Sequence, residues 1–219
     1  MTEALSFLDP LKEVPGVRVD FVERIDGIDV DGERDEVLER LDPAHRMRVR
    51  SLSGSEDWWK AEQVHGGDIA VVGSGGSRRM IPAVDGLITR LRGETLGIYV
   101  ADCGAIWLAD RRTGAVGLLH SGKKGTEANI LKRGVEALTR LSGSAPEDLV
   151  VVLGPCIRPP HYEVDFAATI RNQASDLGVG KYHDCGIDTA GDSDRYYSYR
   201  MERGRTGRML ALIVGGVES

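Results

Sequence analysis

Cysteine, aromatic residues and long apolar runs are all scarce in this chain of 219 residues. Its three cysteines are too few for a disulfide framework in a chain of this length, so we expect reduced thiols. The longest apolar run, at residues 209–217, is too short to span a bilayer, and no secretory signal is recognisable near the N-terminus. These absences predict a cytoplasmic protein without a membrane partner.

Positive charge is also in short supply. The chain has 28 Lys and Arg against 34 Asp and Glu, a net charge of −6, which argues against a nucleic-acid partner because such binders carry a basic face. A hydrophobic content of 41% is ordinary for a globular protein. The chain shows no internal repeat, low-complexity segment or linker, so we expect a single domain over residues 1–219.

Many strand patterns and few helix patterns predict an α+β fold in which strands pack with a few helices. The predicted strands are 17–22, 46–52, two within 60–72, 85–89, 96–100, a hairpin within 101–121, 149–153, and a closing pair 196–200 and 209–214. The predicted helices are 35–41, ended by Asp42-Pro43, 126–141 and 166–177. Residues 73–77 are predicted to form a loop, and Asp85 to cap a turn.

Residues 101–125 combine an apolar hairpin with chemically active side chains at one end. A four-residue turn at 111–114 places Ala105 opposite His120 in an antiparallel register. Cys103 lies two residues before Ala105, so side-chain alternation puts its thiol on the same face as His120, about 7–8 Å away between Cβ atoms. A register slip of one residue would put the two on opposite faces.

His65 is the candidate for a third polar group at this site, because it stands between a predicted strand and a double glycine. One cysteine and two histidines without a fourth protein ligand form the catalytic kind of zinc site, with one position left for water or substrate. The spacing matches no zinc finger, and spacing alone favours a buried cysteine and hydrogen-bonded core histidines. Both interpretations stay open on these residues.

Six short motifs occur in order between residues 63 and 214. They are Gln63-Val-His-Gly66, Asp85-Gly-Leu-Ile-Thr89, Ala101-Asp-Cys103, His120-Ser-Gly122, Gly154-Pro155 with Tyr162-Glu-Val164, and Tyr197-Ser-Tyr-Arg200 with Thr206-Gly-Arg208. This series resembles the YfiH-type polyphenol oxidase (laccase) domain family, whose members are zinc-dependent enzymes of purine nucleosides. The N-terminal third carries no clear family motif and is the divergent part of the chain.

The resemblance implies a mixed α/β fold and a zinc ion held by His65, Cys103 and His120. It also implies purine nucleoside phosphorylase activity, adenosine deaminase activity, or both, with a purine nucleoside and phosphate as small-molecule partners. The family's usual His-Ala-Gly-Trp-Arg-Gly sequence is His-Ser-Gly-Lys-Lys-Gly at residues 120–125 here. The contacts to the substrate therefore differ in this chain, while the metal ligands are kept.

Charged residues beside these motifs are candidates for the chemistry. Deamination needs a group that shuttles protons, and Asp102 and Glu163 are the candidates, although a regular strand would turn Asp102 away from the thiol. Phosphorolysis needs cations that hold phosphate, and Lys123, Lys124 and Arg200 are the candidates. The two lysines are equally well explained as part of a solvated loop.

Two other functions fit the same residues. Cys103 could act as a nucleophile with His120 as its base, in a thiol hydrolase or deamidase. The chain could also be a non-catalytic protein that binds a nucleoside or an anion. A multi-copper oxidase is excluded, because five histidines cannot supply its copper sites, although a single copper could bind His65, Cys103 and His120 in vitro. The sequence does not indicate an oligomeric state.

Overall fold

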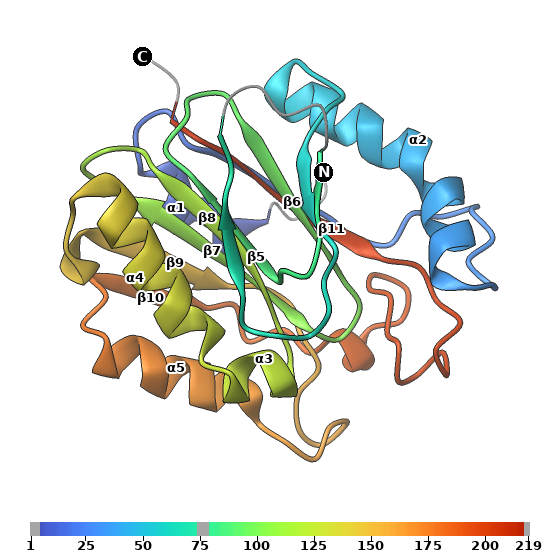
Figure 1. The fold of residues 1–219 in the computed structure, drawn as a ribbon. Helices are drawn as coiled ribbons and strands as arrows, with labels where there is room; N and C mark the ends of the chain where they lie inside the picture. The colour runs from blue at the N-terminus through green and yellow to red at the C-terminus, as the bar shows by residue number, and fades with distance from the viewer. Residues whose placement is uncertain (1–4, 74–78, 217–219) are drawn as a thin grey trace.

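The computed structural model describes residues 5–73 and 79–216 and contains two mixed β-sheets (Figure 1). The five-stranded sheet has the order β1-β11-β6-β2-β4, and the six-stranded sheet has the order β10-β9-β7-β8-β5-β3. The strands are β1 Arg18–Val22, β2 Trp59–Ala61, β3 Ile69–Val71, β4 Met80–Ile81, β5 Gly86–Thr89, β6 Thr95–Val100, β7 Gly104–Asp110, β8 Val116–Ser121, β9 Leu149–Leu153, β10 Lys181–Asp184 and β11 Met209–Val214. The predicted mixed fold class is confirmed.

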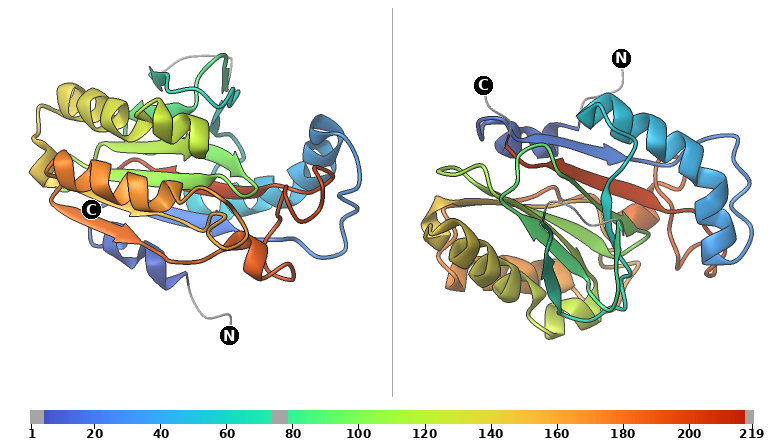
Figure 2. Two further views of the ribbon diagram at one scale, coloured as in Figure 1. Left: turned by 90° about the horizontal axis from the view of Figure 1, so that it is seen from below. Right: turned by 45° about the horizontal axis from the view of Figure 1, so that its top comes forward.

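Helices cover the outer faces of both sheets (Figure 2). The α-helices are α1 Asp9–Lys12, α2 Arg34–Ser53, α3 Lys123–Glu127, α4 Ile130–Ser142 and α5 Phe166–Asp176. The 3₁₀ helices are Ser6–Leu8, Pro146–Asp148 and Thr189–Gly191. Helices α4 and α5 pack on the six-stranded sheet, and α2 packs on the five-stranded sheet. Within the described ranges, no helix is long and apolar enough to cross a membrane.

The main core lies between the two sheets and explains the continuous apolar runs of the central strands. Strands such as β7 and β9 are buried along their whole length, because one face meets the opposite sheet and the other meets α4 and α5. Trp107 lies in this core, packs edge-on against Phe7 and Phe21, and donates from Nε1 to the Leu212 carbonyl at 2.9 Å. That bond satisfies its only polar atom.

The predicted hairpin register is confirmed. Strands β7 and β8 pair antiparallel with Ala105 opposite His120. Ala105 and Trp107 both belong to the core between the sheets, so His120 lies on that same side at the end of β8. The hairpin thus brings polar chemistry to one end of the apolar layer between the sheets.

The predicted helix at 35–41 is confirmed, but its end at Asp42-Pro43 and the strand at 46–52 are wrong. A single helix, α2, runs from Arg34 to Ser53 with Pro43 inside it, where we expected a helix end followed by a strand at 46–52. Proline removes one helical hydrogen bond. The buried residues of α2 recur at a spacing of four and continue past the proline onto the sheet: Val37, Leu41, His45 and Val49. Burial of this stripe outweighs the lost bond.

Two further predictions need correction. The expected helix over 126–141 is divided into α3 and α4 by Asn129, whose φ of 56° interrupts the helix, and α3 includes the lysines we expected on a loop. The expected strand at 196–200 is wrong, because residues 196–198 are irregular and 199–200 begin a turn, and β11 pairs with β1 and β6 instead. Most of the loop expected at 73–77 lies outside the described residues.

His45 makes the stability of the fold dependent on pH. Its ring is fully buried beside Tyr99, and neither ring nitrogen has a hydrogen-bond partner in the described structure. Burial lowers the pKa of His45 from 6.5 to about 4, because an imidazolium loses its hydration there. The unfolded chain therefore takes up this proton at a higher pH than the folded one. Stability present above pH ~6.5 is lost as the pH falls towards ~4.

Urea unfolding at pH 7 and pH 4.5 tests this dependence. Between the two conditions the wild type is expected to lose about 2 kcal/mol more stability than His45→Phe, which keeps a buried ring but cannot titrate. Each protein is compared with itself at pH 7, so any packing change in the variant cancels. Equal losses in both proteins would show that the pKa of His45 is not lowered in the folded state.

Candidate functional site

Three side chains from separate segments converge at the end of the layer between the sheets. His65 comes from the loop after β2, Cys103 from the residue before β7, and His120 from the end of β8. Their potential ligand atoms all lie within 4.8 Å of one another. The two imidazole rings lie 4.9 Å apart between centroids and nearly perpendicular, at 76°. In the part of the chain that the structure describes, this is the one cluster of three or more such side chains.

A buried carboxylate fixes the loop that carries His65. His65 has a φ of 62°, a left-handed backbone conformation that is unfavourable for residues other than glycine. Asp85 compensates by accepting hydrogen bonds from three consecutive backbone N–H groups, those of Val64 at 3.2 Å, His65 at 2.9 Å and Gly66 at 2.7 Å. The loop is therefore held in the shape that brings His65 to the cluster.

Gln63 connects the loop that carries His65 to the five-stranded sheet, through Tyr99 of β6. Its side-chain amide donates to the Tyr99 carbonyl at 2.6 Å and its amide oxygen accepts from the Tyr99 N–H at 2.9 Å. Gln63 also has a positive φ, of 65°. Two strained residues in one short loop, both stabilised by side-chain bonds, are typical of a loop shaped for a site.

Asp85 also orients His120, a role that the sequence analysis missed. Its Oδ1 lies 2.8 Å from His120 Nδ1, and the carboxylate is fully buried. Burial raises the pKa of Asp85, but the bonds to His120 and to the backbone N–H groups outweigh burial, so the net pKa is lowered. The bond to Nδ1 leaves Nε2 for the cluster, the usual arrangement for a histidine that binds a metal. A buried acid at the start of an apolar strand was the available signal.

The thiol of Cys103 is activated by its neighbours. Burial opposes its ionisation, but hydrogen bonding to His120 and His65 outweighs burial and lowers the pKa of the thiol from 9.0 to about 6. Gly122 leaves room for the sulfur, since a Cβ at that position would lie 2.5 Å from Sγ. At neutral pH the group is a thiolate, the form that binds metals and attacks electrophiles.

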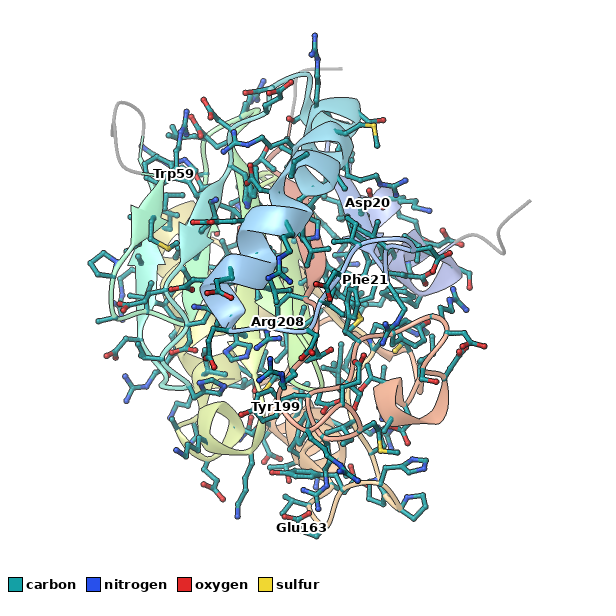
Figure 3. The ribbon with its side chains drawn as sticks, turned by 90° about the vertical axis from the view of Figure 1, so that its right-hand side faces the viewer. Asp20, Phe21, Trp59, Glu163, Tyr199 and Arg208 are labelled. Carbon is teal, nitrogen blue, oxygen red and sulfur yellow. The ribbon has the colours of Figure 1, made fainter. Side chains whose placement is uncertain are left out.

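The cluster lines a cavity of about 850 Å³, large enough for a nucleoside. The other side chains around it are mostly aromatic and cationic: Tyr99, Tyr162, Phe166, Tyr199, Arg34, Lys123, Arg200, Arg203 and Arg208. Figure 3 shows Arg208 and Tyr199 near the N-terminal end of α2, with Glu163 farther away. The surroundings therefore offer flat apolar surfaces and positive charge.

Asp102 lies in the cavity lining, but its carboxylate is already engaged. One oxygen accepts from Thr189 Oγ1 at 2.8 Å and the other accepts from the Arg200 N–H at 2.7 Å. Its φ of 76° breaks the strand, so the alternation that was expected to turn Asp102 away from the thiol does not apply. Asp102 connects the start of β7 to the turn that carries Arg200.

Only some of the other predicted site residues line the cavity. Lys123 and Arg200 line the cavity, whereas Lys124 and Glu163 are exposed and are not part of its lining. Glu163 pairs with Arg200 at 3.0 Å, and the Arg200 guanidinium lies 5.2 Å from the centre of the Tyr162 ring. The structure thus brings two of the three proposed phosphate-binding cations to the cavity.

The family model described as multi-copper polyphenol oxidoreductase laccase matches residues 27–168 and 161–215. The chain belongs to this family. Among its relatives is a purine nucleoside phosphorylase of Streptomyces griseus, 32% identical over 200 residues that cover 79% of this chain and 75% of the relative. The purine nucleoside phosphorylase YlmD of Geobacillus stearothermophilus is 31% identical over 197 residues, 72% of each chain.

Solved structures in the family share the fold. The crystal structure of YlmD from Geobacillus stearothermophilus matches with a TM-score of 0.75 and 26% identity over 93% of each chain. A Bacillus licheniformis protein, YfiH, matches with the same TM-score of 0.75 at 22% identity over 92% of this chain and 93% of its own. The predicted family resemblance is confirmed by both kinds of similarity.

Proposed function

We propose that this chain is a zinc-dependent enzyme that acts on purine nucleosides, by phosphorolysis of the bond between base and ribose, by deamination of adenosine, or by both. The observation that carries the proposal is the convergence of His65, Cys103 and His120 in the lining of a nucleoside-sized cavity. Relatives of 31% and 32% identity that are named purine nucleoside phosphorylases support the class of substrate.

The donor set fits a single metal ion. One thiolate and two imidazoles with no fourth protein ligand suit zinc with a position open to substrate, and the same donors also accept copper. A zinc ion bound there would supply a Lewis acid for the substrate. Within the described residues, the cluster contains too few histidines for the several coppers of the family's description.

The proposed phosphorolysis forms a bond between a phosphate oxygen and C1′ of the ribose while the bond from C1′ to the base breaks. Lys123, Lys124 and Arg200 are the proposed phosphate-binding cations, and Lys123 and Arg200 line the cavity. Preorganised cations stabilise the negative charge of the attacking phosphate without the cost of reorganising water. The aromatic side chains of the lining offer surfaces on which a purine can stack.

Proton transfer in the proposed deamination is assigned to Asp102 and Glu163. Asp102 is 7% exposed and lies in the cavity lining, where it would exchange one of its hydrogen bonds, from Thr189 or from the Arg200 N–H, for a bond to the ligand. Glu163 pairs with Arg200 and reaches the ligand only if that ion pair opens. Of the two, Asp102 is therefore the stronger proposal.

Metal analysis combined with a nucleoside screen tests the function. We expect one zinc per chain in the purified protein, and release of free base from adenosine, inosine or guanosine only when phosphate is present. Conversion of adenosine to inosine without phosphate would identify deamination. Protein that contains no zinc and turns over none of these nucleosides would contradict the proposal.

A thiol enzyme is the second candidate, because the Cys103 pKa of about 6 suits a nucleophile beside an imidazole. In this case Cys103 would attack the substrate and His120 would carry the proton. Chelators and a thiol-alkylating reagent separate the two candidates. Activity that survives metal removal but is lost on alkylation of Cys103 would favour the thiol enzyme, whereas loss with chelator and recovery with zinc would favour the metalloenzyme.

A further inference from the structure

Cationic side chains outnumber acidic ones in the lining of the cavity, and of these cations Arg200 pairs with Glu163 outside the lining. Five cationic side chains line the cavity against two acidic ones, Glu33 and Asp102. Asp102 is already bonded through both oxygens. In a protein with a net charge of −6, a local excess of cations indicates an anionic ligand.

Arg208 is the cation that most needs an anion. It is half-buried, and the structure gives it no carboxylate partner in the described ranges. Its Nη1 donates to the carbonyls of Thr206 and Gly207, each at 2.9 Å, which fixes the guanidinium while Nε and Nη2 stay available. Other half-buried arginines do pair with acids, Arg24 with Glu202 and Arg158 with Asp184.

Arg34 brings a second positive charge to the same place. It is the first residue of α2 and lines the cavity together with Arg208. It is exposed, and it contacts only the neighbouring Asp35 at 3.7 Å and the Glu62 carbonyl at 3.4 Å among the contacts of the described residues. Burial lowers the pKa of Arg208, and the charge of Arg34 lowers it further, while Cys103 and Asp102 act in the opposite direction. Two like charges that line one cavity repel each other, and an anion bound between them relieves this repulsion.

We propose that Arg208 and Arg34 form a subsite for a phosphoryl dianion, close to the His65–Cys103–His120 cluster. The guanidinium fork matches two oxygens of a phosphoryl group, which a lysine cannot do. The dianion has two sources, inorganic phosphate as a co-substrate or a phosphate ester carried by the nucleoside. The first source would replace Lys123, Lys124 and Arg200 as the phosphate site. The second would add a site and make the substrate a nucleotide.

Binding of three probes distinguishes these cases: inorganic phosphate, adenosine 5′-monophosphate and adenosine. Calorimetry on the wild type, Arg208→Gln and Arg34→Gln is expected to show about 10- to 100-fold weaker binding of a phosphoryl probe in both variants, with adenosine binding unchanged. Weaker binding of inorganic phosphate identifies the co-substrate site, and weaker binding of the monophosphate alone identifies a substrate phosphate. Unchanged affinities for both anions in both variants overturn the proposal.

Two further variants control the experiment. Arg205→Gln removes the same charge from the same turn, but Arg205 pairs with Asp31 and does not line the cavity, so its anion binding is expected to equal the wild type. Arg208→Lys keeps the charge and loses the fork, so it is expected to fall between wild type and Arg208→Gln. If Arg208→Gln does not fold, Arg208→Lys and the exposed Arg34→Gln decide the outcome.

The proposed subsite rests on the proposed function only in the role that it gives the bound phosphoryl group in the reaction. Its test measures binding, not turnover, so the two can fail separately. Phosphoryl binding that depends on Arg208 in a protein without phosphorolysis would leave the subsite intact and remove the function. Phosphorolysis that Arg208→Gln leaves unchanged, with unchanged affinities for inorganic phosphate and for the monophosphate, would leave the function intact and remove the subsite.

Discussion

Cys103→Ser is expected to remove stoichiometric zinc from the protein and to abolish turnover of nucleosides. Cys103 is one of three side chains in the cluster, and its thiolate is the only one with a negative charge. A serine hydroxyl stays protonated at neutral pH and is a poor zinc ligand. Removing a residue that hydrogen-bonds to a metal ligand typically weakens metal binding ~10- to 100-fold. Removing the ligand itself is therefore expected to weaken zinc binding by more than this. Metal analysis and equilibrium dialysis against zinc measure it.

Cys185→Ser is the matched control for this variant. Cys185 is a free, half-buried cysteine like Cys103, but it stands after β10 and is not part of the cluster. The control is expected to keep its zinc and its activity. If Cys103→Ser binds zinc as tightly as the control, the cluster is not the metal site. Loss of activity with zinc retained would support Cys103 as a nucleophile.

Much of the hairpin could be predicted because its information is local. The register of β7 and β8 depends on turn length and on a side-chain period of two, so the pairing of Ala105 with His120 was correctly predicted. The same reasoning found most central strands, because strands buried on both faces carry continuous apolar runs. Local periodicity is sufficient to predict a feature that depends on a single strand, a single helix or one tight turn.

The contacts that complete the site could not be predicted in this way, because each depends on strand order. Asp85 meets His120 only because β5 pairs with β8. Arg34 and Arg208 line the same cavity only because α2 lies over the sheet that contains β11. Helix α2 itself passes through Pro43, since burial against that sheet stabilises the second half that local propensity disfavours. Sequence motifs therefore identified the metal-binding candidates but not the groups that support them.

Asp85→Asn is expected to weaken zinc binding about 10- to 100-fold, although Asp85 is not itself part of the cluster. The amide removes the charge that stabilises His120, and it replaces one acceptor oxygen with a donor that faces the N–H groups of residues 64–66. The variant therefore loosens both histidines at once, His120 through its ring and His65 through its loop. Zinc affinity by competition with a chelator measures the effect.

Asp110→Asn is the control that separates an effect on zinc binding from a general loss of stability. Asp110 is also fully buried and has a lowered pKa, because hydrogen bonds from Ser144, Thr113 and Arg112 outweigh its burial, but it lies at the far end of β7. Either variant is expected to lose about 1–3 kcal/mol of stability, since each leaves buried partners unsatisfied. Only Asp85→Asn is expected to lower zinc affinity and the pKa of His120, followed by NMR titration of the metal-free protein. Equal zinc affinities in the two variants would reduce Asp85 to a structural residue.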